Sequence, residues 1–260
     1  ISTINNSTLA NFSSGARVYE DASIYSLGVG TNALANITSG TNNTAVGYSS
    51  LYTNTSGSDN SALGQNALYS NTSGQGNSAF GVQSLYTNTS GGYNSAFGIS
   101  ALYNNTSGTN NSAFGNDALY SNTIGDKNAA FGESALRSNT DGGYNAAIGA
   151  HAGYSNSSGS RNVFLGYGAG YTNDGDDNVF IGNEAGYNET GSNKLYISNS
   201  SSSNLITGDF STGALSLGQS SGTVTVLNDL SVTSSLYIGD TALTNNNGTL
   251  EWDGSAVGGG

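Results

Sequence analysis

The chain has 260 residues, of which 35% are apolar and 8% are charged, and it contains 39 glycines. Its net charge of −12 comes from 17 acidic and five basic residues, so nucleic acid is not an expected partner, because phosphate binding needs clustered lysine and arginine. Cysteine is absent, which excludes disulfides and thiolate metal sites, and no run of 18 apolar residues occurs, so we expect no membrane insertion.

Residues 1–25 are interpreted as a lead-in or a partial coil, and the repetitive part of the chain covers residues 26–200. Each repeat reads approximately N-S-A-F-G-x-x-A-L-Y-S-N-T-S-G-x-x. Three columns keep a spacing of 17 residues: glycines from Gly30 to Gly166, glycines from Gly40 to Gly159, and asparagines from Asn43 to Asn162. Such a fixed period is typical of solenoid proteins, and about ten coils fit into the segment.

The short apolar-polar segments between the glycine corners predict strands rather than helices. Coils stacked at about 4.8 Å would pair their backbones as a parallel β-solenoid, or β-roll, and ten of them would rise roughly 50 Å. The absence of proline favours this fold, because each coil has to donate backbone N–H groups to a neighbour. We therefore predict an all-β chain.

Two columns of large apolar residues are predicted to fill the interior of the coils. The first is Val46, Leu63, Phe80, Phe97, Phe114, Phe131, Ile148, Leu165 and Ile181, and the second is Leu51, Leu68, Leu85, Leu102, Leu119 and Leu136. Alanines alternate with the first column and are predicted to face a partner chain: Ala45, Ala62, Ala79, Ala96, Ala113, Ala130 and Ala147. A coil of 17 residues is narrow, so association is expected to complete the burial.

The phrases "NSAFG" and "NVFLG", followed by "ALYSNTSG", resemble the head and shaft repeats of trimeric adhesins and phage-type tail fibres. These include YadA-like heads and the mosaic adhesive trimers of predatory bacteria. The resemblance covers roughly residues 26–200. It implies an intertwined homotrimer in which each chain forms a β-roll about a common axis.

Residues 201–260 lose the 17-residue period and are predicted to form a β-stranded, trimeric stalk or junction. Apolar residues two positions apart indicate strands here: Leu215 and Leu217, Val224 and Val226, Leu230 and Val232, and Leu236 and Ile238.

These features predict a non-enzymatic structural shaft or head of an extracellular fibre, on a virion tail or a bacterial surface, that displays or spaces a receptor-binding tip. His151 is the only histidine, so a hydrolase triad of the usual kind cannot be assembled. In the alternative interpretation, the repeat surface itself binds a cell-surface glycan or another receptor. Triplets such as Thr53-Asn54-Thr55 also resemble the T-x-T ranks of ice-binding solenoids, although the Ser-Gly that follows them favours a turn.

Two sets of residues are candidates for ligand binding. A tyrosine column beside the leucine column either stacks sugar rings or packs as a structural ladder: Tyr52, Tyr69, Tyr86, Tyr103 and Tyr120. The carboxylates of Asp174, Asp176 and Asp177 either bind Ca²⁺, which prefers oxygen ligands, or lie in a solvated turn. Neither the EF-hand loop nor the RTX nonapeptide is matched, and no further cofactor is expected.

Overall fold

The computed structural model describes residues 25–218 with their side chains, and outside this range it describes the backbone of six strands. The described residues are all-β, without a helix, and so contain no helix of the length and apolarity that a membrane span requires. The chain divides into two compact units, Ile1–Ser220 and Ser221–Gly260.

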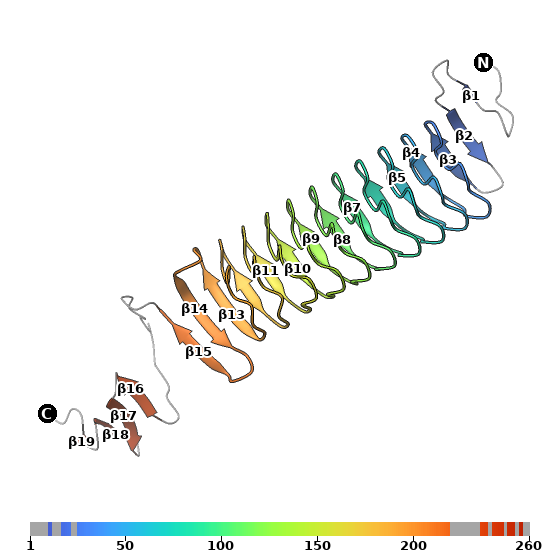
Figure 1. Cartoon of the computed structure of the whole chain (residues 1–260). Coiled ribbons are helices and arrows are strands. Elements are labelled where there is room, and N and C mark those ends of the chain that lie inside the picture. The colour runs from blue at the N-terminus through green and yellow to red at the C-terminus, as the bar shows by residue number, and fades with distance from the viewer. Residues whose placement is uncertain are drawn as a thin grey trace. The chain divides into compact units, whose positions relative to one another are not determined.

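The first unit is a stack of short strands joined by loops (Figure 1). Its strands are β1 (Ala10–Asn11), β2 (Arg17–Asp21), β3 (Ser26–Val29), β4 (Thr44–Val46), β5 (Ser61–Leu63), β6 (Ser78–Phe80), β7 (Ser95–Phe97), β8 (Ser112–Phe114), β9 (Ala129–Phe131), β10 (Ala146–Ile148), β11 (Val163–Leu165), β12 (Val179–Ile181), β13 (Lys194–Ser198), β14 (Asn204–Asp209) and β15 (Ala214–Leu217). All fifteen belong to one sheet, in chain order.

Strands β3 to β13 run parallel, and each is one coil further along the chain than its neighbour. Ser95, Ala96 and Phe97 pair with Ser112, Ala113 and Phe114, for example, 17 residues later. The sheet turns antiparallel between β2 and β3 at one end and between β13 and β14 at the other. The parallel β-solenoid of about ten coils predicted from the period is therefore confirmed.

The leucine column lies in the interior as predicted, since Leu51, Leu68 and their equivalents are 0% exposed. The assignment of the two faces of the strands was wrong. The alanine column points inward and is buried, whereas the Phe/Leu/Ile column points outward. Phe131 is 40% exposed and Ile148 is 48% exposed, while Ala130 and Ala147 are 0% exposed.

The physical reason is the narrow cross-section of the coil. Successive residues of a strand point to opposite sides, and the leucine of the opposing segment already occupies most of the interior. Only a small side chain fits beside it. In the last coils the arrangement is exchanged: Gly153, Gly170 and Gly186 stand where leucine is expected, and the buried residues Phe164 and Phe180 replace alanine. A Cβ on Gly186 would lie 2.6 Å from the Phe180 ring.

Two asparagine columns account for the polar part of the interior. Asn77 Nδ2 donates to the Gly91 carbonyl at 2.9 Å, and Asn88 Nδ2 donates to the same carbonyl at 3.0 Å. Through most of the stack the asparagines also bond to their equivalents in the adjacent coil: Asn94 N–H donates to Asn77 Oδ1 at 3.0 Å, for example. Because these groups are 0% exposed, the bonds remove the cost of burying amides without partners.

Glycine is required where coils touch most closely. At Gly98 φ is +145°, a conformation that L-residues rarely adopt, and a Cβ there would overlap the carbonyl of Gly115 in the next coil. This clash explains why the glycine column is unbroken through the solenoid.

The second unit contains four antiparallel strands in chain order: β16 (Ser235–Ile238), β17 (Thr241–Asn246), β18 (Thr249–Trp252) and β19 (Ser255–Ala256). The strands predicted around Leu215 and around Leu236 are confirmed as β15 and β16. The expected pairs Val224–Val226 and Leu230–Val232 lie outside the described residues.

We expect Ala96→Asp to lower the free energy of unfolding by about 3–5 kcal/mol, because it places a carboxylate in the interior without a cation to pair with. No lysine or arginine occurs between Arg17 and Lys127. The control is Ile99→Asp in the same coil, since Ile99 is 56% exposed. Urea unfolding followed by circular dichroism measures both variants. Equal stability of the two would contradict the inward direction of the alanine column.

Candidate functional site

The predicted tyrosine column forms a continuous stack. Tyr52 and Tyr69 have ring centroids 5.2 Å apart, and the spacing between Tyr86 and Tyr103 is 5.0 Å. The stack continues beyond the five residues expected from the sequence, with Arg137 inserted between two tyrosine segments. In full, the Tyr column is Tyr52, Tyr69, Tyr86, Tyr103, Tyr120, Arg137, Tyr154, Tyr171 and Tyr187.

Arg137 occupies the position of a ring in this column. Its guanidinium lies 5.0 Å from the centroid of Tyr120 and 5.9 Å from that of Tyr154, so a cation–π contact replaces ring stacking on both sides. Asp117 lies 3.8 Å from Arg137 Nε and balances its charge. The column therefore stays continuous although Arg137 replaces a tyrosine in it.

The tyrosine rings cover each other's faces, and these are the surfaces on which a sugar ring would have to stack. Inside the column each ring has a neighbour on both sides at about the thickness of one coil, so solvent meets ring edges and hydroxyls. Burial raises the pKa of Tyr103, and the neighbouring Tyr86 and Tyr120 raise it further. These contacts match the structural-ladder interpretation of the column.

The three aspartates of the predicted calcium site have separate partners. Asp174 Oδ1 accepts backbone N–H groups from Ser157 at 2.7 Å and Ser158 at 2.8 Å. Burial raises the pKa of Asp174, but the hydrogen bonds from these serines outweigh burial and hold it below its usual value. Asp176 accepts from Ser160 N–H at 2.8 Å.

Asp177 completes this set with a bidentate ion pair to Arg161, at 2.6 Å and 2.9 Å. The Arg161 hydrogen bond lowers the pKa of Asp177. Within the described residues, no three His, Cys, Asp or Glu side chains come together in a way that would hold a metal ion. Asp174 and Asp176 instead accept backbone N–H groups of the preceding coil, and Asp177 pairs with the Arg161 side chain of that coil.

The hydroxyl columns are also engaged inside the stack. Thr72 Oγ1 donates to the Thr89 carbonyl at 3.0 Å, and Thr87 Oγ1 donates to the Tyr103 carbonyl at 2.9 Å. These threonines join coil to coil rather than presenting free hydroxyls in a flat rank. His151 lies among the rings of Tyr154, Tyr167 and Tyr171, and its buried Nδ1 has no hydrogen-bond partner within the described range.

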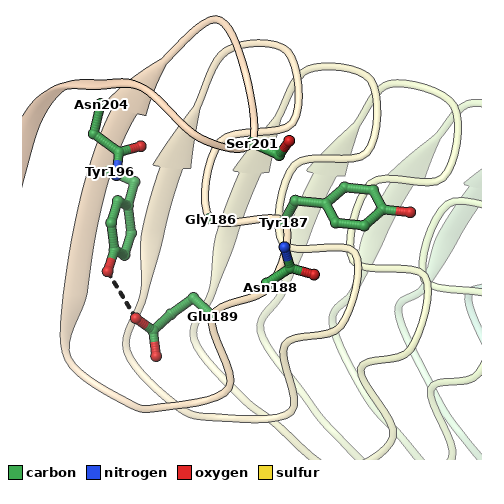
Figure 2. Close-up of a pocket in the computed structure, with 7 residues that line it drawn as sticks. All are labelled: Gly186, Tyr187, Asn188, Glu189, Tyr196, Ser201 and Asn204. Atoms are coloured by element: carbon green, nitrogen blue, oxygen red, sulfur yellow. Dashed lines mark hydrogen bonds between the residues drawn. The ribbon is translucent and has the colours of Figure 1, made fainter.

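A pocket of about 210 Å³ lies at the end of the parallel stack, where β13 is followed by a turn into β14 (Figure 2). Tyr196 takes the inward position that Phe180 has in the previous coil, and the two rings meet edge to face at 5.3 Å. The pocket is lined by Gly186, Tyr187, Asn188, Glu189, Tyr196, Ser201 and Asn204.

Glu189 is fixed in this pocket by two hydrogen bonds. Its Oε2 accepts from the Tyr196 hydroxyl at 2.8 Å, and its Oε1 accepts from Gly191 N–H at 2.7 Å. Burial raises the pKa of Tyr196 to about 12, and the hydrogen bond to Glu189 and its charge act in the same direction. The phenol is therefore a hydrogen-bond donor rather than an activated nucleophile.

Comparison with known proteins gives no match. No family model, no curated protein and no solved structure is similar enough to the chain to indicate a relationship. What the chain does therefore has to follow from its own geometry and chemistry.

We expect Tyr196→Phe to lower the free energy of unfolding by about 1 kcal/mol at neutral pH, since a partly exposed hydrogen bond to a carboxylate is lost. The folded-state pKa is raised above the ordinary value near 10. The contribution of the bond is therefore complete below about pH 10 and is lost as pH rises through about 12.

Urea unfolding of the parent and of Tyr196→Phe across this pH range measures the difference. The control is Tyr187→Phe, whose hydroxyl has no hydrogen-bond partner in the described part of the chain. A difference between parent and Tyr196→Phe that stays constant up to pH 12 would show that the bond does not contribute as described.

Proposed function

We propose that the chain is a non-enzymatic shaft or head segment of an extracellular homotrimeric fibre, whose task is to hold a receptor-binding tip away from a virion or a cell. One observation carries this proposal. The outward side of the sheet bears an unbroken apolar column that crosses from β3 to β15. We call the outward side of these strands the strand face.

The apolar column of the strand face follows the strand pairing without interruption. It consists of Val29, Val46, Leu63, Phe80, Phe97, Phe114, Phe131, Ile148, Leu165, Ile181, Ile197, Ile206 and Leu217. The phenylalanine rings within it stack at 4.7 to 4.8 Å. The column thus extends over both the parallel coils and the antiparallel strands that follow them.

The second outward column lies two residues earlier in each strand and carries no charge. It contains Thr44 and Ser61 near the beginning and Val163 and Val179 near the end of the solenoid. A protein with a net charge of −12 thus keeps its acidic residues off this face. Two copies of a negatively charged chain can therefore pack through this face without placing like charges opposite each other.

The size of the strand face favours association. Twelve intervals of about 4.8 Å give a length of about 58 Å, and the two outward columns lie about 7 Å apart, so the face covers roughly 400 Å². The largest apolar patch on a typical monomer covers about 300–600 Å² and is often functional, so a face of this area is in the size range of an interaction surface. A narrow coil gains burial from association that its own interior cannot provide.

A second copy of the same chain fits this face best, because its side chains recur with the same spacing of one coil. The side chains recur once per coil, so a partner meets all of them in the same way only if its own spacing is identical. Three copies about one axis follow from the resemblance of the repeats to trimeric adhesins and tail fibres. Repetition then supplies length and stiffness, as expected of a spacer.

We expect the parent protein to elute as a trimer, with three times the monomer mass of 26.2 kDa, and Phe97→Asp to shift it toward monomer. The substitution adds one carboxylate per chain to the proposed interface. Size-exclusion chromatography with light scattering measures the mass. Ile99→Asp, in the same coil but off the strand face, serves as control. A Phe97→Asp protein that stays trimeric like the control would refute the proposed interface.

Removing residues 77–93 should leave a folded protein, because this deletion removes one complete coil. Asn94 N–H then meets Asn60 Oδ1 in place of Asn77 Oδ1, and every column stays in register. We expect the fibre to shorten by about 4.8 Å per deleted coil, measured by electron microscopy on variants lacking one to four coils. Attachment of the intact particle should persist. Loss of attachment in a folded deletion variant would indicate that the repeats themselves recognise the receptor.

A further inference from the structure

Two tyrosines outside the Tyr column have a backbone conformation that is unusual for such large side chains. Tyr93 and Tyr144 have φ of 57° and 61°, in the left-handed region, and each is 59% exposed. Most coils place Asn, Asp or Gly at this position, as at Asn42, Asp59 and Gly76. These are the residue types that adopt the left-handed conformation most easily.

The two tyrosines gain no burial that would offset this conformation. Leu85 and its equivalents also have positive φ, but Leu85 is 0% exposed, so the packing of the interior holds its backbone. Residues in sparsely populated conformations are concentrated at ligand-binding and other functional sites. The strain at two exposed tyrosines therefore indicates a function at this surface.

Both rings are held in place by the preceding coil. Gln75 Nε2 donates to the Tyr93 hydroxyl at 2.8 Å, and a Cβ on Gly76 would lie 2.9 Å from Cδ1 of that ring. Lys127 Nζ donates to the Tyr144 hydroxyl at 2.9 Å and lies 4.8 Å from the centroid of that ring. Each phenol thus accepts one hydrogen bond and keeps its own O–H to donate.

The same sequence, Gly-Gly-Tyr-Asn, occurs at both places, in residues 91–94 and 142–145. The glycine before each tyrosine leaves no side chain beside the ring, and a Cβ there would lie 3.1 Å from a carbonyl of the preceding coil. Tyr93 and Tyr144 are 51 residues apart, which is three coils of 17. They therefore lie on the same side of the solenoid, about 14 Å apart along its axis.

The surface beside Tyr93 is polar and uncharged. Gln75 bonds to the ring hydroxyl from the preceding coil, and Asn110 N–H joins the following coil to the Gly92 carbonyl at 3.1 Å. No charged residue occurs in residues 60–116. An apolar partner would remove water from these amides without replacing its hydrogen bonds. A partner that has both C–H surfaces and hydroxyls meets no such cost.

Sugars have this combination of groups. An exposed aromatic ring packs against the C–H groups of a sugar, and the phenol O–H and the amides bind its hydroxyls. We propose that Tyr93 and Tyr144 form a lateral site for a neutral, linear polysaccharide that lies along the solenoid. A ligand has to span about 14 Å to touch both rings, which a single sugar does not. Because the rings are already held in position, little conformational entropy is lost on binding.

The charge of the protein favours a neutral chain over an acidic one. The net charge of −12 repels polyanions. The cations near Tyr144 already have partners, since Arg161 pairs with Asp177 at 2.6 Å and Lys127 bonds to the ring hydroxyl. An acidic polysaccharide would therefore find no free row of cations along this side.

The lateral site is separate from the strand face. Tyr93 and Tyr144 precede β7 and β10, and the buried Asn94 and Asn145 lie between each tyrosine and the strand. All residues of the site belong to one chain, so the proposal does not rest on the trimer. Binding and oligomeric mass are measured independently, and failure of one proposal leaves the other standing.

Affinity electrophoresis of the full chain in native gels tests the proposal. The probes are hydroxyethyl cellulose, glucomannan and dextran, with polygalacturonate as the anionic comparison. We expect at least one neutral polysaccharide to slow migration. Tyr93→Asn and Tyr144→Asn should each weaken this binding about threefold or more, and the double variant about tenfold or more. Asparagine is chosen because Asn42 and Asn110 show that the fold accepts it at this position.

The chain offers a matched control in Tyr48 and Tyr167, which are 55% and 53% exposed. Their φ values lie outside the left-handed region, and they belong to a different column. The double variant Tyr48→Asn with Tyr167→Asn should bind as the parent does. Thermal melts confirm that all variants are folded, and light scattering compares their mass with that of the parent.

Four results would overturn the proposal. The first two are a lack of retardation by every neutral polysaccharide, and equal binding by the Tyr93/Tyr144 and Tyr48/Tyr167 double variants. The third is tighter binding of polygalacturonate than of any neutral probe. The fourth is a lower oligomeric mass of the Tyr93/Tyr144 variant than of the parent, which would place the rings between chains. Binding lost in this variant alone, at unchanged mass, would establish the site.

Discussion

One backbone carbonyl in each coil holds the interior together. The carbonyl of Gly91 and its equivalents accepts hydrogen bonds from two asparagine side chains that lie 14 residues before and three residues before the glycine. Those asparagines bond in turn to their equivalents in the adjacent coil. The glycine, the two asparagines and the coil length are therefore interdependent. A change in any one of them would leave buried amide groups without partners.

The sequence predicts the solenoid but not which side of each strand points inward. Strand alternation separates Ala96 from Phe97 without indicating which of them is buried, and general hydrophobicity favours the wrong choice. The deciding factor is the width of the coil. A usable signal was present: where leucine gives way to Gly170, alanine gives way to Phe164. An exchange of this kind places both positions on the same side, because one side chain occupies the volume that the other leaves.

The sequence also predicts part of the candidate site. Column spacing identified five tyrosines of the stack, and the same reasoning applied to the later coils would have added Tyr154, Tyr171 and Tyr187. The pocket was not predictable from the period, since it forms where the period stops and β14 turns back antiparallel. The one hint is Tyr196, which continues the inward column of Phe180 with a ring whose hydroxyl needs a partner when it is buried.

The direction of the coil-to-coil hydrogen bonds has a mechanical consequence. They run along the axis of the stack, so tension between the two ends of the solenoid loads them in series, and the outermost coil detaches before the others. A coil of 17 residues contributes about 4.8 Å to the axis but contains roughly 58 Å of extended chain. Each detached coil therefore lengthens the tether by roughly 50 Å. A stack of this kind yields in repeatable steps, and it can dissipate a sudden load before the two ends of the solenoid separate completely.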